Sequence, residues 1–239
     1  MCYYNSVSIR LWIFFTDACI FHLGVRNIMQ IVICSLLGYF IGNINPAFII
    51  AKINGFDIRK RGSGNAGASN TIITIGKKAG IFVAVFDIFK AVAASLLAAY
   101  FFPDIRFAKI LSGSCCILGH IFPILMKFHG GKGLASLAGT IIAFNPIVFG
   151  IMLVLEFILG LSIDYVCIVP VSGSVIFTMI YALSTGDAVG TSILSVVAMV
   201  ILFKHIENFK RIQNGTEAHI SFLWKKDQEI ARIRKNTND

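Results

Sequence analysis

Long apolar runs dominate this chain and restrict what it can fold into. The clearest of them cover residues 31–51, 79–102, 107–126, 167–183 and 188–203. A helix needs about 20 apolar residues to cross the hydrocarbon core of a bilayer. Only 14% of the residues are charged, whereas a typical soluble domain carries about 25%. The sequence therefore predicts an all-α polytopic membrane protein.

One further apolar stretch, residues 134–162, contains the pair Asn145-Pro146 near its middle. Proline cannot continue a helix from the preceding turn, and the residue before it is biased away from helical angles. We therefore expect two helices, at about 134–144 and 147–162, of which the first is short for a span. The predicted number of transmembrane helices is about seven, or five to six if the short pieces do not cross.

The distribution of lysine and arginine predicts the orientation. With the N-terminus outside and the C-terminus in the cytoplasm, segments 52–78, 127–133, 161–166 and 204–239 are cytoplasmic. These segments hold six, two, none and eight basic residues, which is sixteen of the 21 in the chain. Cytoplasmic loops of membrane proteins are enriched in basic residues, so this orientation is favoured. The same rule accounts for the net charge of +9, and we predict no nucleic-acid partner.

The ends of the chain fit the pattern of spans less well. Residues 1–28 contain an apolar stretch that charged residues interrupt before it reaches span length. We expect this N-terminal extension to be poorly ordered or interfacial, and Met29 to be the natural start. Residues 30–220 are expected to form the seven-helix domain, and residues 221–239 a basic cytoplasmic tail.

Three polar segments interrupt the apolar pattern, and the first reads Arg61-Gly-Ser-Gly-Asn-Ala-Gly-Ala-Ser-Asn70. Glycines let backbone N–H groups approach an anion closely, and hydroxyl and amide side chains can bond phosphate oxygens. The candidate phosphate-binding residues here are Arg61, Gly62, Ser63, Gly64, Asn65 and Asn70. The alternative is a flexible interhelical turn flanked by ordinary basic residues.

The second segment, Lys127-Phe-His-Gly-Gly-Lys-Gly-Leu-Ala-Ser136, leads into an apolar helix. A glycine turn that feeds a helix N-terminus is an anion site, because the first N–H groups lack partners and the helix dipole is positive there. The nucleotide P-loop spacing is missing, so ATP hydrolysis is not predicted. The alternative is a helix boundary with a membrane-flanking lysine. The candidates are Lys127, Gly130, Gly131, Lys132, Gly133 and Ser136.

The third segment runs from His205 to Glu217. On a helix, His205, Asn208 and Arg211 share one face because they are three residues apart. We expect Glu217 to anchor a basic residue rather than to touch a ligand. The alternative is a solvated amphipathic helix that leaves the membrane.

Two charged residues lie inside the second apolar run, Asp87 and Lys90. A charge at the middle of a bilayer costs at least about 2.5–3.5 kcal/mol, so we expect them to face the bundle interior, where they could pair. There they either support the site or touch a ligand. His120 precedes the second segment and is either a packing residue or part of the site. The sequence has no G-x-S-x-G motif and no cluster with metal-ligand spacing, so we predict no serine-hydrolase site, no metal and no cofactor.

Taken in order, these segments resemble the PlsY family, the membrane acyl-phosphate-dependent glycerol-3-phosphate acyltransferases of bacteria. The resemblance runs from about Gln30 to about Ile220. It rests on the stretches Gly42–Lys52, Asp57–Thr71, Gly119–Pro123, Lys127–Ser136 and His205–Glu217. It implies a seven-helix enzyme of the bacterial plasma membrane with a cytoplasmic active face. The implied reaction makes 1-acyl-glycerol 3-phosphate from acyl phosphate and glycerol 3-phosphate, as a step of phospholipid synthesis. The implied partners are these two substrates and membrane lipid. The oligomeric state is left open.

The motifs and the resemblance together assign roles to individual residues. The predicted catalytic residues are His205, Asn208, Lys132 and His120. The predicted substrate-binding residues are Lys52, Arg61, Gly62, Ser63, Gly64, Asn65, Asn70, Lys127, Gly130, Gly131, Gly133, Ser136 and Arg211. The predicted structural supports are Asp87, Lys90 and Glu217. The resemblance implies that the second segment binds glycerol 3-phosphate. This chain departs from the family pattern at Asn43, Asn45 and Asp164.

The chemistry that follows is direct acyl transfer between two phosphate-bearing substrates, with no covalent acyl-enzyme. The proton acceptor is either the leaving phosphate or a histidine, His205 or His120, whose ordinary pKa suits the role. Two alternatives stay open: a membrane transporter for a phosphate compound, and a non-catalytic binder of such a compound.

Overall fold

The computed structural model describes residues 27–217, 219, 220 and 232, and its regular structure there is helical. A first helical segment covers residues 27–43. The later α-helices are α2 (Pro46–Ile53), α3 (Ala68–Thr74), α4 (Lys77–Phe101), α5 (Ala108–Ile121), α6 (Leu134–Phe144), α7 (Pro146–Ile163), α8 (Val169–Thr185) and α9 (Ala188–Gln213). Short 3₁₀ turns are η1 (Ile58–Lys60), η2 (Ile124–Met126) and η3 (Val166–Ile168).

The predicted chain ends lie almost wholly outside the described residues. Of the extension 1–28, only residues 27 and 28 are described, and they belong to the first helical segment. Of the tail 221–239, only Arg232 is described. The predicted division of the chain into extension, helical domain and tail therefore stays a prediction.

Six helices in the described part of the chain are long and apolar enough to cross a membrane by length and composition. The apolar helix α6 is shorter than these spans: it has 11 residues and at 1.5 Å per residue is about 16 Å long. It runs beside α5, and the Lys109 ammonium donates to the carbonyl of Ala143 at 3.3 Å. The short helix therefore reaches the level at which α5 begins.

The predicted break at Asn145-Pro146 is confirmed. Asn145 follows the last residue of α6, and its side-chain oxygen accepts hydrogen bonds from the N–H groups of Ile147 (2.8 Å) and Val148 (3.3 Å). Pro146 takes the first position of α7, where its missing N–H would have had no partner in any case. One Asn-Pro pair therefore ends one helix and caps the next.

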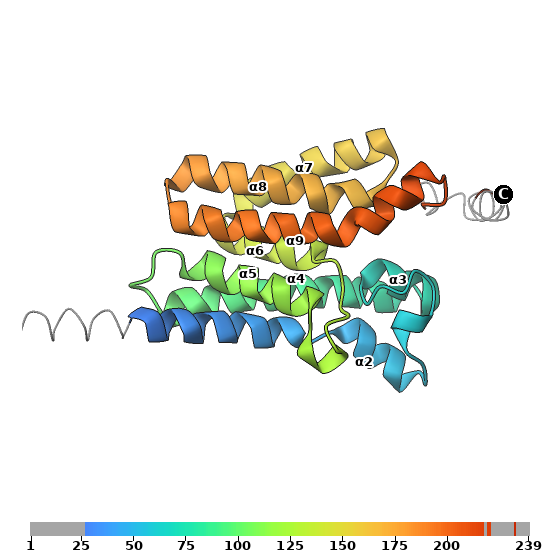
Figure 1. The fold of residues 1–239 in the computed structure, drawn as a ribbon, viewed down its shortest axis with the longest axis horizontal. Helices are drawn as coiled ribbons and strands as arrows, with labels where there is room; N and C mark the ends of the chain where they lie inside the picture. The colour runs from blue at the N-terminus through green and yellow to red at the C-terminus, as the bar shows by residue number, and fades with distance from the viewer. Residues whose placement is uncertain (1–26, 218, 221–231, 233–239) are drawn as a thin grey trace, which may run out of the picture.

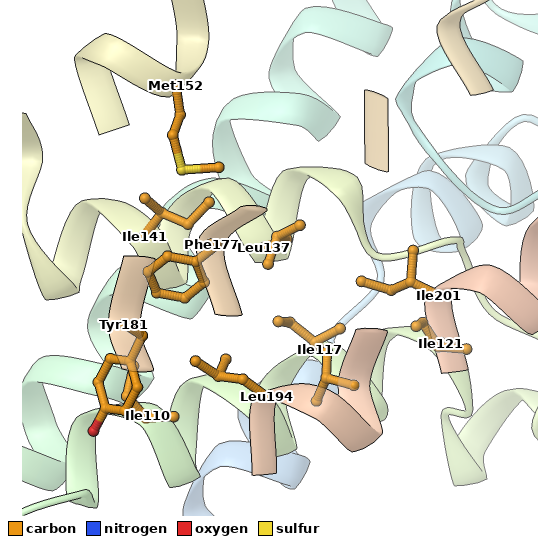
Figure 2. Close-up of a cluster of buried hydrophobic side chains, with 11 residues drawn as sticks. Ile110, Ile117, Ile121, Leu137, Ile141, Met152, Phe177, Tyr181, Leu194 and Ile201 are labelled. Atoms are coloured by element: carbon orange, nitrogen blue, oxygen red, sulfur yellow. The ribbon is translucent and has the colours of Figure 1, made fainter. Parts of the chain in front are cut away.

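The helices form two groups, with α6 between them. Figure 1 shows α7, α8 and α9 on one side of the bundle, and the first helical segment with α4 and α5 on the other. The largest buried apolar cluster joins α5, α6, α8 and α9, with Met152 from α7 at its edge (Figure 2). Its labelled members are Ile110, Ile117, Ile121, Leu137, Ile141, Met152, Phe177, Tyr181, Leu194 and Ile201. This core holds together α6 and α9, the helices next to the second and third polar segments, because both pack against α5 and α8.

Glycines let the helix backbones approach closely. A Cβ on Gly38 would lie 2.1 Å from the carbonyl oxygen of Ser112, and one on Gly139 would lie 2.2 Å from that of Ile88. Small residues at such crossings are typical of helix packing in membranes. The first helical segment is thereby pressed against α5, and α6 against α4.

We expect Gly139→Ala to lower the free energy of unfolding by about 1–3 kcal/mol, because the new methyl group must push α6 away from a backbone carbonyl of α4. Gly150→Ala is the matched control, since Gly150 is also helical and nothing lies within 4 Å of its added Cβ. Thermal unfolding in detergent measures both. Equal melting temperatures for the two variants would contradict the close packing of α4 and α6.

Candidate active site

The three polar segments meet at one end of the bundle, where α6 begins and α9 ends; we call it the site end. The Lys132 ammonium, just before α6, donates a hydrogen bond to the side-chain oxygen of Asn208 in α9. The Arg59 guanidinium, just before the first segment, donates to the carbonyl of Met126 in η2 at 2.7 Å. Direct contacts therefore join the second segment to the third and the first to the turn that precedes the second.

The glycine turn of the second segment folds back over the end of α5. The N–H groups of Gly130 and Gly131 donate to the carbonyls of Ile121 (3.1 Å) and His120 (3.0 Å). A Cβ on Gly131 would lie 2.0 Å from His120 Nε2, so only glycine fits there without a shift. Gly133 has a left-handed backbone and gives α6 no side-chain cap. The first N–H groups of α6 thus lack partners within the helix, as an anion site requires.

Four side chains form a continuous polar chain across the site end. Lys132 bonds the oxygen of Asn208, and the Asn208 amide donates to Glu217 at 2.6 Å. Glu217 also accepts from Arg211 at 2.7 Å. The predicted anchoring role of Glu217 agrees with this geometry, because its carboxylate holds Arg211 and Asn208. Lys132 and Arg211 are brought to one place although they lie far apart in sequence.

The electrostatics of Lys132 follow from its position. Burial lowers the pKa of its ammonium from 10.5 to about 8, and repulsion from Arg211 adds to the effect. A bound anion would stabilise the charged form of this buried ammonium, because it replaces the hydration that burial removes. Lys132 is the best-placed cation for a phosphate at the glycine turn.

His205 is buried in α9 beside this chain and is 2% exposed. Its Nδ1 lies 2.8 Å from the carbonyl oxygen of Ile201. Because a carbonyl accepts but cannot donate, Nδ1 carries the proton in the neutral ring and Nε2 is the acceptor. The ring therefore has one nitrogen able to take a proton.

Asp87, Lys90 and His120 form a buried cluster under the glycine turn. The Lys90 ammonium lies 2.7 Å from an Asp87 carboxylate oxygen and 3.1 Å from His120 Nδ1. It also donates to the carbonyls of Gly42 (3.1 Å) and Ile44 (2.7 Å). The predicted pairing of Asp87 with Lys90 inside the bundle is present. The cluster ties α4 to α5 and to the end of the first helical segment.

The first segment is organised by Asn70, which is fully buried. Its side-chain oxygen accepts from the N–H of Ser63 at 2.9 Å. Its amide donates to the carbonyls of Ile58, Arg61 and Asn65. The polar atoms of Asn70 are thus used within the loop, whereas Arg61, Gly62, Ser63 and Gly64 are exposed.

The base of this loop is held by Asp57 and Arg59. Arg59 Nη2 lies 2.7 Å from an Asp57 carboxylate oxygen. This side-chain hydrogen bond lowers the pKa of Asp57 to about 2. Because Arg59 also reaches Met126, the pair fixes the first segment against η2.

Other predicted site residues lie away from the polar chain. Lys52 is exposed and its ammonium lies over the ring of Phe48, 5.5 Å from the centroid. Lys127 is exposed, with a left-handed backbone. The Ser136 hydroxyl is buried and faces the carbonyl of Asp87 in α4 at 3.5 Å. None of these three contacts Lys132 or Asn208 in the described hydrogen bonds, so their predicted substrate contacts stay predictions.

The departures from the family pattern have structural partners. The Asn43 side chain accepts from the N–H of Ile124 at 2.7 Å and donates to the carbonyl of Tyr39 at 2.7 Å. Asn45 caps α2 by accepting from the N–H of Phe48 and donates to the carbonyl of Ala66. Both asparagines therefore connect the first helical segment to the loops of the site end. For Asn45, the signal in the sequence was a cap-forming residue type directly before Pro46.

Sequence reasoning also missed Lys204. It is half-buried on α9, and its ammonium lies 5.2 Å from the centroid of the Phe122 ring. The available signal was its spacing, since it stands four residues before Asn208 and so on the same side of the helix. Within the described residues, no group of three or more His, Cys, Asp or Glu side chains could hold a metal ion.

This fold and site define a polytopic helical membrane protein with a cationic, glycine-containing site at one end of its bundle. A family model described as glycerol-3-phosphate acyltransferase matches residues 32–215. The chain belongs to this family, and the resemblance to PlsY proteins is confirmed.

This chain is similar to named relatives over most of their length. A glycerol-3-phosphate acyltransferase of Macrococcus caseolyticus is 39% identical over 195 residues, covering 81% of this chain and 99% of the relative. Glycerol-3-phosphate acyltransferase 3 of Bacillus anthracis is 37% identical over 188 residues, covering 78% and 93%. The crystal structure of PlsY, an integral membrane glycerol 3-phosphate acyltransferase, in its glycerol 3-phosphate form matches with a TM-score of 0.71 and 28% identity. That match covers 81% of this chain and 96% of PlsY.

Proposed function

We propose that this protein transfers an acyl group from an acyl phosphate to the 1-hydroxyl of glycerol 3-phosphate. The products are 1-acyl-glycerol 3-phosphate and inorganic phosphate, and the reaction serves phospholipid synthesis. Membership of the glycerol-3-phosphate acyltransferase family supports the acceptor. The observation that carries the proposal is the polar chain from Lys132 through Asn208 and Glu217 to Arg211, next to the uncapped start of α6.

The site end supplies what such a reaction needs. The hydroxyl oxygen of the acceptor forms a bond to the acyl carbon, and the bond from that carbon to the phosphate oxygen breaks. Acyl phosphate is a mixed anhydride and is already activated, so the protein acts mainly by holding two anions together and offsetting their repulsion. Lys132 and Arg211 are the cations placed for this, and the uncapped start of α6 adds backbone N–H groups.

The leaving phosphate takes the proton of the attacking hydroxyl in this proposal. His205 is the rival acceptor, because its Nε2 is free to accept while Nδ1 faces the carbonyl of Ile201. His120 is less suited, since its Nδ1 lies within 3.1 Å of the Lys90 ammonium and the ring belongs to the buried charge cluster.

The two proton acceptors differ in the pH profile of a His205→Gln variant. If the phosphate accepts the proton, the acidic limb of the kcat profile belongs to the substrate, and we expect it to keep its midpoint in the variant even if the rate falls. Steady-state kinetics between pH 5 and 9 measure this. Loss of the acidic limb in the variant, with a fall in rate of about 10²–10⁴-fold, would assign the proton to His205.

The pH dependence on the alkaline side follows from Lys132. Its pKa is lowered to about 8, so the ammonium is charged below this pH and loses its proton as the pH rises through it. We expect kcat/KM for glycerol 3-phosphate to fall above about pH 8, approaching tenfold per pH unit. Lys132→Arg stays charged and should not show this fall. An alkaline limb that persists unchanged in Lys132→Arg would contradict the assignment.

We also place the protein in the bacterial plasma membrane with its site end facing the cytoplasm. The three polar segments belong to the basic segments that were predicted to be cytoplasmic. Hydrogen bonds between the polar segments and their neighbouring turns place all three at the site end. The excess of lysine and arginine on cytoplasmic loops supports this side. Glycerol 3-phosphate is a water-soluble acceptor and would reach the site from there.

The decisive experiment is an assay of the purified protein in detergent with labelled glycerol 3-phosphate, using acyl phosphate and acyl-CoA in parallel. We expect acylated product with acyl phosphate. If product forms with acyl-CoA and not with acyl phosphate, the assignment of acyl phosphate as the donor is wrong. Binding of acyl phosphate without product would favour the non-catalytic binder. Transport cannot produce an acylated product in detergent, so any product excludes the transporter as the sole function.

A further inference from the structure

Lys204 is a cation of the site end that the mechanism above does not use. Its ammonium lies over the ring of Phe122, 5.2 Å from the centroid. Phe122 follows the last residue of α5, and its carbonyl accepts a hydrogen bond from the Tyr39 hydroxyl at 2.8 Å. A cation over an aromatic face is attracted by the ring. Lys204 is therefore held at a defined place beside the glycine turn.

No carboxylate of the described residues neutralises the charge of Lys204. In the ion pairs of the described residues, no carboxylate lies within 4.0 Å of Lys204 or of Lys132. Arg211, in contrast, is paired with Glu217. Lys204 is also near enough to Lys132 for repulsion between them to contribute to the lowered pKa of Lys132. Lys204 and Lys132 are thus half-buried cations of the site end that no ion pair of the described residues neutralises, whereas Lys52, Arg61 and Lys127 are exposed to solvent. A phosphate group bound at each of the two half-buried lysines would balance its charge.

The two cations differ in depth. Asn208, which contacts Lys132, stands four residues after Lys204 on α9, so Lys204 starts about 6 Å further from the site end along the helix. Leu202, Phe203 and Ile206, next to Lys204 on α9, are exposed apolar side chains. A phosphate at Lys204 would therefore lie nearer to the bilayer interior and beside a lipid-facing surface. That position suits a phosphate that carries an acyl chain.

We propose that Lys204 binds the phosphate group of the acyl phosphate, while Lys132 binds that of glycerol 3-phosphate. This inference rests on the proposed function and assigns the two anionic substrates to two levels of one site. The acyl chain of the donor then runs along the apolar surface of α9. The phosphate of a bilayer lipid has the same chemistry, so the test must separate a substrate phosphate from a lipid headgroup.

The test compares Lys204→Gln, Lys204→Met and Lys204→Arg with the unchanged protein, in detergent free of phospholipid. With hexadecanoyl phosphate as donor, we expect the Gln and Met variants to raise KM for the donor at least about tenfold. KM for glycerol 3-phosphate should stay within about twofold, and Lys204→Arg should restore most of the donor affinity. Lys204→Met keeps an apolar stem on Phe122, so it reports on the charge even if Lys204→Gln unfolds.

Controls separate this inference from its rivals. Lys210→Gln changes an exposed lysine of the same helix that pairs with Glu207, and neither KM should move. Unchanged donor KM in both Lys204→Gln and Lys204→Met overturns the inference, as does an equal rise in both KM values. A rise seen only in bilayers that contain anionic lipid assigns Lys204 to a headgroup instead. If the unchanged protein gives no product from acyl phosphate, the proposed function fails before the variants are compared.

Discussion

Lys132→Ala is expected to lower kcat/KM for glycerol 3-phosphate by about 100- to 1,000-fold, the loss found when one preorganised charge-stabilising donor is removed. Lys132 is half-buried, contacts Asn208 directly, and stands at the uncapped start of α6. No other lysine of the described residues bonds to Asn208. We expect KM for glycerol 3-phosphate to rise more than KM for the acyl donor, because the glycine turn is assigned to the acceptor.

Steady-state kinetics with each substrate varied in turn measure this effect. Lys210→Ala is the control, because its side chain and that of its partner Glu207 are 61% and 69% exposed and such pairs contribute little. A larger rise in KM for the donor than for the acceptor would reassign the glycine turn to acyl phosphate and would exchange the roles of Lys132 and Lys204.

Asp87→Asn is expected to reduce the free energy of unfolding by about 3–5 kcal/mol, because it leaves the buried ammonium of Lys90 without its carboxylate. Asp87 and Lys90 are 1% and 3% exposed, and their charged atoms are 2.7 Å apart. The carbonyls of Gly42 and Ile44 remain for Lys90, but they carry no net charge. Unfolding in detergent, followed by heat or by denaturant, measures the loss.

The double variant Asp87→Leu with Lys90→Met removes both charges and should be more stable than Asp87→Asn. Glu207→Gln breaks the exposed pair with Lys210 and should change stability by at most about 1 kcal/mol. If Asp87→Asn is as stable as Glu207→Gln, the buried pair is not what ties α4 to α5 and to the first helical segment.

Much of the fold could be predicted from the sequence, because hydropathy directly reports which segments avoid water. The break at Asn145-Pro146 was predictable for the same local reason, since proline and asparagine act within one turn. The span count was less certain because α6 is too short for the usual length rule and is defined instead by its neighbours, α4, α5 and α8. Hydropathy does not encode that contact.

The candidate site was predictable as a set of segments and less so as a set of contacts. The pairing of Lys132 with Asn208 joins residues 76 apart in the chain, and no local pattern encodes it. Ser136 shows the same limit, because no local pattern encodes that its hydroxyl faces the carbonyl of Asp87 in α4. Lys204 was missed because a basic residue near the end of a span usually needs no further explanation.

The Asn70 side chain bonds within its own loop, and this affects how mutations in the first segment should be interpreted. The side-chain amide of Asn70 bonds to three carbonyls and one N–H of the same loop, so the conformation of the whole loop depends on this one side chain. A change at Asn70 would therefore displace the exposed Arg61 and Ser63 and mimic the loss of their side chains. Variants within this segment should show strong epistasis, and alanine scanning one position at a time would overstate how many of its side chains meet the substrate.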